Sequence, residues 1–158
     1  FITNKYMKES HNLVINISFF VFLVIMIYLN YNNQLSSKLD LSISILAIII
    51  SIMLLLFKNT SILDTAHFLY CFVYLFSVSF ISENQYLLVL NVIMLLAIIF
   101  SRYYYNGCLL NEKQNNEGYF SDLNAIVKKY FFFWNWDYLF PLLLLVSSGR
   151  FMKLKGYL

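Results

Sequence analysis

The side chains most able to do chemistry in this sequence gather in one apolar stretch, residues 62–81. Its polar and ionisable members recur at intervals of three and four residues, so a helix would place them on one face: Asp64, His67, Tyr70, Cys71, Tyr74 and Ser77. An ionisable group is costly to bury in a membrane helix and is therefore a candidate for function. A polar face of this kind can line a proton path or a ligand cavity.

Each of these residues also has a structural interpretation. The run from Ser61 to Asp64 has the form of a capping box, in which Ser61 caps a helix and Asp64 reaches back to an unbonded backbone N–H. We favour this cap for Asp64, and for His67 a hydrogen bond to a neighbouring helix or subunit. Tyr70 and Tyr74 are packing residues with a polar tip unless a cofactor is present.

Two further features predict contacts between helices. Asn91 is the lone amide within the apolar run 86–101, and we expect it to bond across helices with a contribution of about 1 kcal/mol. Ser44, Ala47 and Ser51 form a stripe of small side chains that permits the close approach of a second helix.

No pattern typical of a catalytic or cofactor site accompanies these residues. The sequence has two histidines and two cysteines without the spacing of a metal site, and it contains no glycine-rich phosphate loop. We therefore expect no catalytic residue, no metal and no cofactor. The net charge of +3 predicts contact with anionic lipid head groups. Because the basic residues form no dense cluster, we expect no nucleic-acid partner.

The composition assigns the chain to the membrane proteins. Of its 158 residues 61% are hydrophobic and 12% are charged, whereas a soluble domain carries about 25% charged residues. These values exclude an ordinary soluble domain, a disordered chain and a disulfide-rich scaffold. We predict an all-α fold, a polytopic membrane helix bundle in which residues 1–158 form a single integral membrane domain.

Four apolar runs approach the length of about 20 residues that a bilayer core requires of a helix. The connectors between them are short and rich in turn formers, which predicts an up-and-down bundle of antiparallel neighbours. The expected spans are 13–30, 41–57, 62–81 and 86–101.

The last third of the chain has a different character. Residues 102–120 form a polar loop of a length typical of functional or partner-binding loops, and an aromatic segment follows at 121–150. That segment can be interfacial, re-entrant or a fifth span, and the positive-inside rule favours the first two. If it spans, Asp137 in its middle is buried and needs a basic partner, such as a Lys or Arg of another chain.

The amino-acid usage points to an AT-rich genome. Phe and Tyr number 16 and 13, whereas Gly and Pro number 4 and 1. The first pair has A/T-rich codons and the second has G/C-rich codons, and membrane burial alone does not explain an excess of tyrosine. Such a gene is typical of an organelle, a large DNA virus or an AT-rich microbe.

The layout resembles subunit six of the mitochondrial NADH-quinone oxidoreductase, a family of short chains with four closely connected spans, a long polar loop and a last hydrophobic segment. The run Ala66–Leu69 is similar to the start of that family's third helix, where an acidic residue stands in the place of His67, and Tyr74 matches a downstream tyrosine. Members of that family use a distortion of this helix in coupling to proton pumping. Glycine permits that distortion in the family, whereas this chain lacks the Tyr-Val-Gly-Ala signature and has no glycine within 1–106, which gives no basis for expecting it.

The function we expect is that of a non-catalytic integral membrane subunit of a larger complex, specifically a divergent organelle-encoded respiratory-chain subunit. Its partners would be other integral membrane subunits and lipids, and its location the mitochondrial inner membrane. Polar side chains on several spans support this, because four thin helices offer few partners for them. The alternatives are a structural membrane protein of a large AT-rich DNA virus, and a small transporter or membrane enzyme that uses the Asp64/His67 face.

Overall fold

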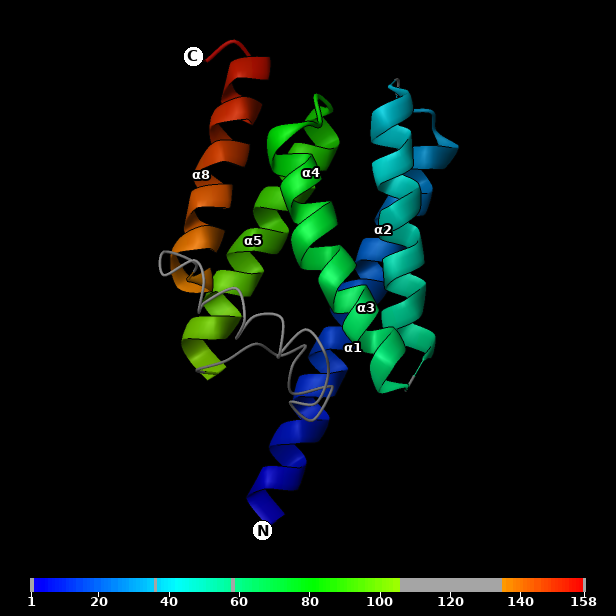
Figure 1. The fold of residues 1–158 in the computed structure, drawn as a ribbon, viewed down its shortest axis with the longest axis vertical. Coiled ribbons are helices and arrows are strands. Elements are labelled where there is room, and N and C mark those ends of the chain that lie inside the picture. Colours follow the sequence, from blue (N-terminus) through cyan, green and yellow to red (C-terminus); the bar gives the residue numbers. More distant parts are fainter. Residues whose placement is uncertain (1, 36, 58, 106–134, 158) are drawn as a thin grey trace.

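The computed structural model describes residues 2–35, 37–57, 59–105 and 135–157, and over these ranges the chain is a bundle of helices without a strand (Figure 1). The predicted all-α fold is therefore confirmed. The third span consists of three consecutive segments, α3, η1 and α4. The elements are α1 (Ile2–Tyr31), α2 (Lys38–Leu56), α3 (Thr60–Phe68), η1 (Leu69–Tyr74), α4 (Leu75–Phe80), α5 (Gln85–Tyr105) and α8 (Trp136–Leu154).

Four helical stretches in the described part are long and apolar enough to cross a membrane, which is the number predicted. They are Asn12–Tyr31, Lys38–Leu56, Ser61–Phe80 and Gln85–Tyr104. Helix α5 continues to Tyr105, which is three residues past the start predicted for the polar loop, residue 102. A basic residue in the last turn favours this continuation, since the guanidinium of Arg102 faces the negative end of the helix dipole. The rest of the predicted loop lies outside the described residues.

Helix α8 lies lengthwise beside α5 and α4 rather than across the end of the bundle (Figure 1). Its 19 residues are about 28 Å long, close to the thickness of a bilayer core. This arrangement favours a fifth span over an interfacial helix, although α8 is less apolar than the four stretches above. Within the predicted segment 121–150, the first part lies outside the described residues, and the helix continues past its predicted end to Leu154.

The position predicted for Asp137, in the middle of the last segment, was wrong. Helix α8 begins at Trp136, so the carboxylate lies in the first turn, where negative charge is favourable. Asn135 caps this end, because its side-chain oxygen accepts a hydrogen bond from the backbone N–H of Asp137 at 2.9 Å. Charge at the end of a helix needs no burial in the apolar core.

The third span is the central helix of the bundle. Half of its length is buried, compared with 28% of the first and fourth spans. Its first part packs on α2, and its last part packs on α5 and α8, so the span slants across the molecule (Figure 1). The segment η1 lies where the span leaves α2 for its other neighbours.

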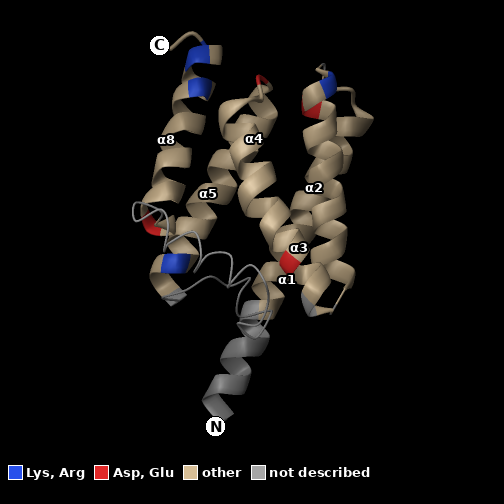
Figure 2. Cartoon of the chain, in the orientation of Figure 1, with Lys and Arg blue, Asp and Glu red and all other residues tan. Residues whose placement is uncertain are grey.

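Charged side chains gather at the two ends of the described bundle, and the middle contains almost none (Figure 2). One end carries Arg102 and Asp137, and the other carries Lys38, Asp40, Glu83, Arg150, Lys153 and Lys155. Asp64, about one turn into α3, lies level with Arg102, toward the first of these ends (Figure 2). A belt without charge is what a bilayer core demands, because a charged side chain is costly at its centre.

Candidate functional site

The polar face predicted for the third span lies toward the interior of the bundle. Five of its six members are no more than 5% exposed, and Ser77 is half-buried. The five buried residues are Asp64, His67, Tyr70, Cys71 and Tyr74. A single helix thus brings two ionisable groups and two phenols into one buried region.

The capping role predicted for Asp64 was wrong. Asn59 caps α3, since its side-chain oxygen accepts a hydrogen bond from the backbone N–H of Ser61 at 2.9 Å. The third position after this cap, from which a capping-box side chain reaches back, is Ile62. Asp64 lies two residues further on and is buried, because the asparagine two residues before Ser61 already starts the helix.

The third span contains a π-helical segment, η1, which the sequence gave us no reason to expect. The backbone N–H of Leu75 bonds to the carbonyl oxygen of Tyr70, five residues earlier, whereas an α-helix bonds four residues earlier. The span from Thr60 to Phe80 contains neither glycine nor proline. The wider turn therefore forms without either of the two residues that most often accompany a helix distortion.

Stacked aromatic rings line the π-helical segment on two faces. Tyr70 and Tyr74 stack with their ring centroids 5.8 Å apart and their planes 8° apart. On a second face Phe72 stacks with Phe68 and with Phe76, at centroid distances of 5.0 and 6.4 Å. Such pairs are worth about 0.5–1.5 kcal/mol each beyond the area they bury. Ring packing thus supports the wider turn in place of backbone freedom.

Helix α1 closes the site from one side with two phenylalanines. Phe19 contacts Tyr70 edge-to-face at 5.2 Å, and Phe22 contacts Tyr74 edge-to-face at 5.4 Å. The Tyr74 side chain is fully buried, and its hydroxyl has no hydrogen-bond partner among the described residues. Burying a hydroxyl without a hydrogen-bond partner costs free energy. Either the packing of the tyrosine ring offsets this cost, or the hydroxyl has a functional role.

A second polar cluster joins α4, α5 and α8. Asn91 donates its amide hydrogens to the hydroxyls of Ser79 and Ser147, each at 3.0 Å, and Ser147 donates to Ser79 at 3.0 Å. All three residues are fully buried. Sequence reasoning had singled out Asn91 and missed both serines, because nothing in the sequence near either serine indicates their common neighbour.

We expect Asn91→Ala to lower the free energy of unfolding by about 1 kcal/mol, since it removes two hydrogen bonds between helices inside the membrane. Unfolding of the detergent-solubilised chain by SDS measures the change. Ser42→Ala is the matched control, because Ser42 is exposed and donates only to the carbonyl of Lys38 in its own helix. Equal effects of the two substitutions would contradict a stabilising role for the cluster.

The stripe of small residues on α2 faces the interior. Ser44, Ala47 and Ser51 are fully buried, and Ser44 accepts a hydrogen bond from the side chain of Asn30 on α1. At the same end of the bundle, Ser82 donates to the buried carboxylate of Asp40 at 2.6 Å, which ties the start of α2 to the connector after α4. Sequence reasoning missed Asp40, because the expected span 41–57 begins one residue after it.

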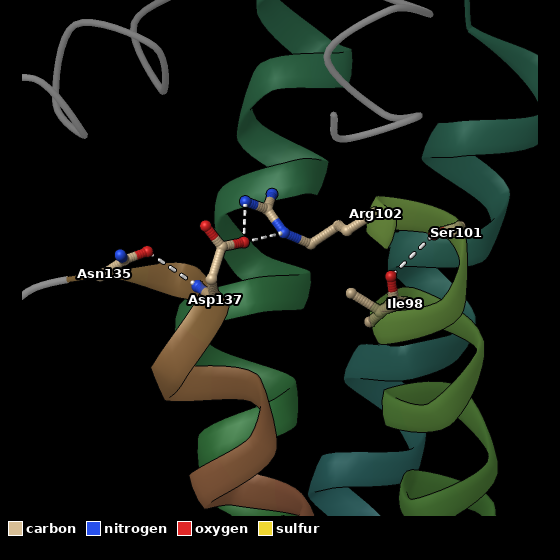
Figure 3. Close-up of polar contacts among 5 residues, drawn as sticks. All are labelled: Ile98, Ser101, Arg102, Asn135 and Asp137. Carbon is tan, nitrogen blue, oxygen red and sulfur yellow. Dashed lines mark hydrogen bonds and ion pairs between the residues drawn. The ribbon is translucent and has the colours of Figure 1, made fainter. Parts of the chain in front are cut away.

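Asp137 has a basic partner within the same chain and is exposed, so the buried carboxylate for which a partner on another chain was expected is not present. Arg102, near the end of α5, donates from Nε and Nη2 to one carboxylate oxygen of Asp137, at 3.1 and 2.7 Å (Figure 3). The guanidinium also lies 5.8 Å from the ring centre of Phe140. With Asp137 64% exposed, the pair contributes no more than about 1 kcal/mol and serves mainly to align the two helix ends.

Within the part of the chain that the structure describes, no three His, Cys, Asp or Glu side chains are grouped so that they could hold a metal ion. No protein-family model, curated protein or solved structure matches the chain. Inferences about function therefore rest on the buried face of the third span and on its π-helical segment.

Proposed function

We propose that this chain is a non-catalytic integral membrane subunit of a larger complex, specifically a divergent, organelle-encoded subunit of a respiratory NADH-quinone oxidoreductase. The observation that carries the proposal is the π-helical segment Leu69–Tyr74. It starts two residues after His67, which stands where the subunit-six family has an acidic residue, and it ends at Tyr74. The family uses a glycine-permitted distortion of this helix, and although this chain lacks that glycine, its own third span contains a π-helical turn. Such turns are uncommon in proteins, and where they occur they often lie at functional sites.

The burial of the polar face supports a subunit rather than an independent enzyme or transporter. His67 and Tyr74 are 1% and 0% exposed, so a substrate would have no access to them without rearrangement of the bundle. A group that couples conformational change within a complex needs no such access. The mitochondrial inner membrane and other membrane subunits as partners follow from the same proposal, with the AT-rich amino-acid usage as their support.

Blue-native electrophoresis of the native membrane tests the proposal, with mass spectrometry of each band to locate the chain. We expect it to migrate with a respiratory complex that contains the other NADH-quinone oxidoreductase subunits. A chain found alone in a small band, or together with capsid proteins, would overturn the proposal.

Substitution of the buried histidine separates assembly from catalysis. We expect His67→Ala to lower the amount of assembled complex severalfold, while each complex that does assemble keeps its turnover. Thr65→Ala is the control on the same helix, because Thr65 is exposed and donates only to the carbonyl of Ser61. Normal assembly with lost turnover would instead assign His67 a chemical role.

A further inference from the structure

Helices α1 and α5 leave a groove between them. Helix α1 packs mainly on α2, and α5 packs mainly on α8, so the two share little direct contact. The groove holds a cavity of about 420 Å³. Its walls are apolar and come from three helices, with Ile25 and Leu29 of α1, Val89, Leu90 and Ile93 of α5, and Phe151 of α8.

One end of this α1–α5 groove is polar and basic. Gln85 and Tyr86 at the start of α5 line it together with Lys155 at the end of α8. The Lys155 side chain is exposed and forms no ion pair with any residue that the structure describes. Because no carboxylate lines the cavity, the positive charge at its mouth is matched by nothing in the described chain.

The dimensions of the groove suit a slender occupant. Along α5 it runs from Gln85 to Ile93, about 12 Å at 1.5 Å per residue, so a volume of about 420 Å³ gives a mean cross-section of about 35 Å². An α-helix with side chains is at least about 10 Å wide, which is a cross-section of about 80 Å². A hydrocarbon chain is thin enough to lie within this groove, whereas an additional helix would rest on its open side, where Ile93 is 54% exposed.

We propose that the α1–α5 groove binds one anionic phospholipid of the surrounding bilayer, with an acyl chain along its apolar walls and the phosphate at the ammonium of Lys155. Basic residues at the membrane surface attract anionic head groups, and apolar walls hold a hydrocarbon chain. The site requires only that the chain lies in a membrane, and it is independent of the complex to which the chain belongs.

Photo-crosslinking in vesicles tests the site. The full chain is reconstituted into vesicles of phosphatidylcholine and phosphatidylglycerol in a ratio of about 4:1, with a trace of either lipid in photoactivatable form. We expect phosphatidylglycerol to label peptides of α1 and α5 about fivefold more than phosphatidylcholine, the ratio that about 1 kcal/mol per lysine gives. Lys155→Gln should reduce this preference to near unity, while Lys153→Gln, outside the cavity lining, should change it less than twofold.

A second pair of variants tests the apolar part of the groove. Ile93→Trp should fill it and remove labelling by both lipids, whereas Ile45→Trp, at a similarly exposed position on α2, should not. Equal labelling by the two lipids in the wild type, or labelling that survives both Lys155→Gln and Ile93→Trp, would overturn the proposal. So would an Ile93→Cys variant that cross-links to a second protein, since the occupant would then be a polypeptide.

Discussion

Deletion of a single residue is expected to be tolerated in the third span and not in the second. In η1 the hydrogen bond from Leu75 to Tyr70 encloses one residue more than an α-helical turn. Removing Val73 lets the same N–H and C=O groups close an ordinary α-helical turn, so α3 and α4 keep their neighbours. Tyr74 then moves relative to Tyr70, and their ring stacking is lost. Because the loss is confined to this stacking, we expect the deletion to lower the free energy of unfolding by about 1–2 kcal/mol.

The matched deletion lies in α2, which has no wider turn to absorb it. Removing Ile49, an exposed residue, rotates the remainder of the helix by about 100° and turns Ser51 and Leu54 away from the interior. Several buried positions are lost together, and we expect a cost above about 4 kcal/mol by the measure of large core substitutions.

Unfolding of the two deletion variants by SDS, compared with that of the wild type, measures the difference. Equal destabilisation would show that the extra residue of the π-helical turn cannot be removed without disrupting the helix. Under the proposed function, the Val73 deletion should also yield assembled complex with weakened coupling to proton pumping, because the distortion is then gone while the bundle remains.

The spans were predictable because hydropathy is a local property of the sequence. A run such as residues 41–57 is apolar enough to specify a membrane helix without knowledge of its neighbours. Helix ends were less predictable, since they depend on which of several candidate caps forms. Asn59 and Ser61 both qualify as caps for α3, and only the structure distinguishes them. For the same reason Asp137 was predicted in the middle of a segment, whereas it lies in the first turn of α8.

The π-helical turn and the partners of Asn91 were not predictable, for a different reason. Many helix distortions can be predicted from a glycine or proline. Here the wider turn is instead accompanied by aromatic rings on two faces of the third span and by rings of α1, such as Phe22. Likewise Ser79 and Ser147 lie 68 residues apart, and their hydrogen bond depends on how α4 and α8 pack. Features set by tertiary contacts leave no periodic signal in a single sequence.

Phe22→Ala is expected to lower the free energy of unfolding by about 3 kcal/mol, toward the lower end of the range for buried phenylalanines. Phe22 is 1% exposed and meets Tyr74 edge-to-face at 5.4 Å, so its removal opens a cavity at the centre of the site. Lipid is as apolar as the protein interior, so the loss comes from packing and not from transfer out of water.

Phe20→Ala isolates this packing contribution, because Phe20 lies two residues away on the same helix and is 59% exposed. We expect it to change the free energy of unfolding by less than about 0.5 kcal/mol. The same SDS titration measures both variants. Similar costs for the two would mean that α1 is held by its general apolarity, and that the contacts of Phe22 with the tyrosines do not fix its rotation. A large difference would establish that packing against η1 orients α1, since the two variants delete the same side chain from opposite sides of one helix.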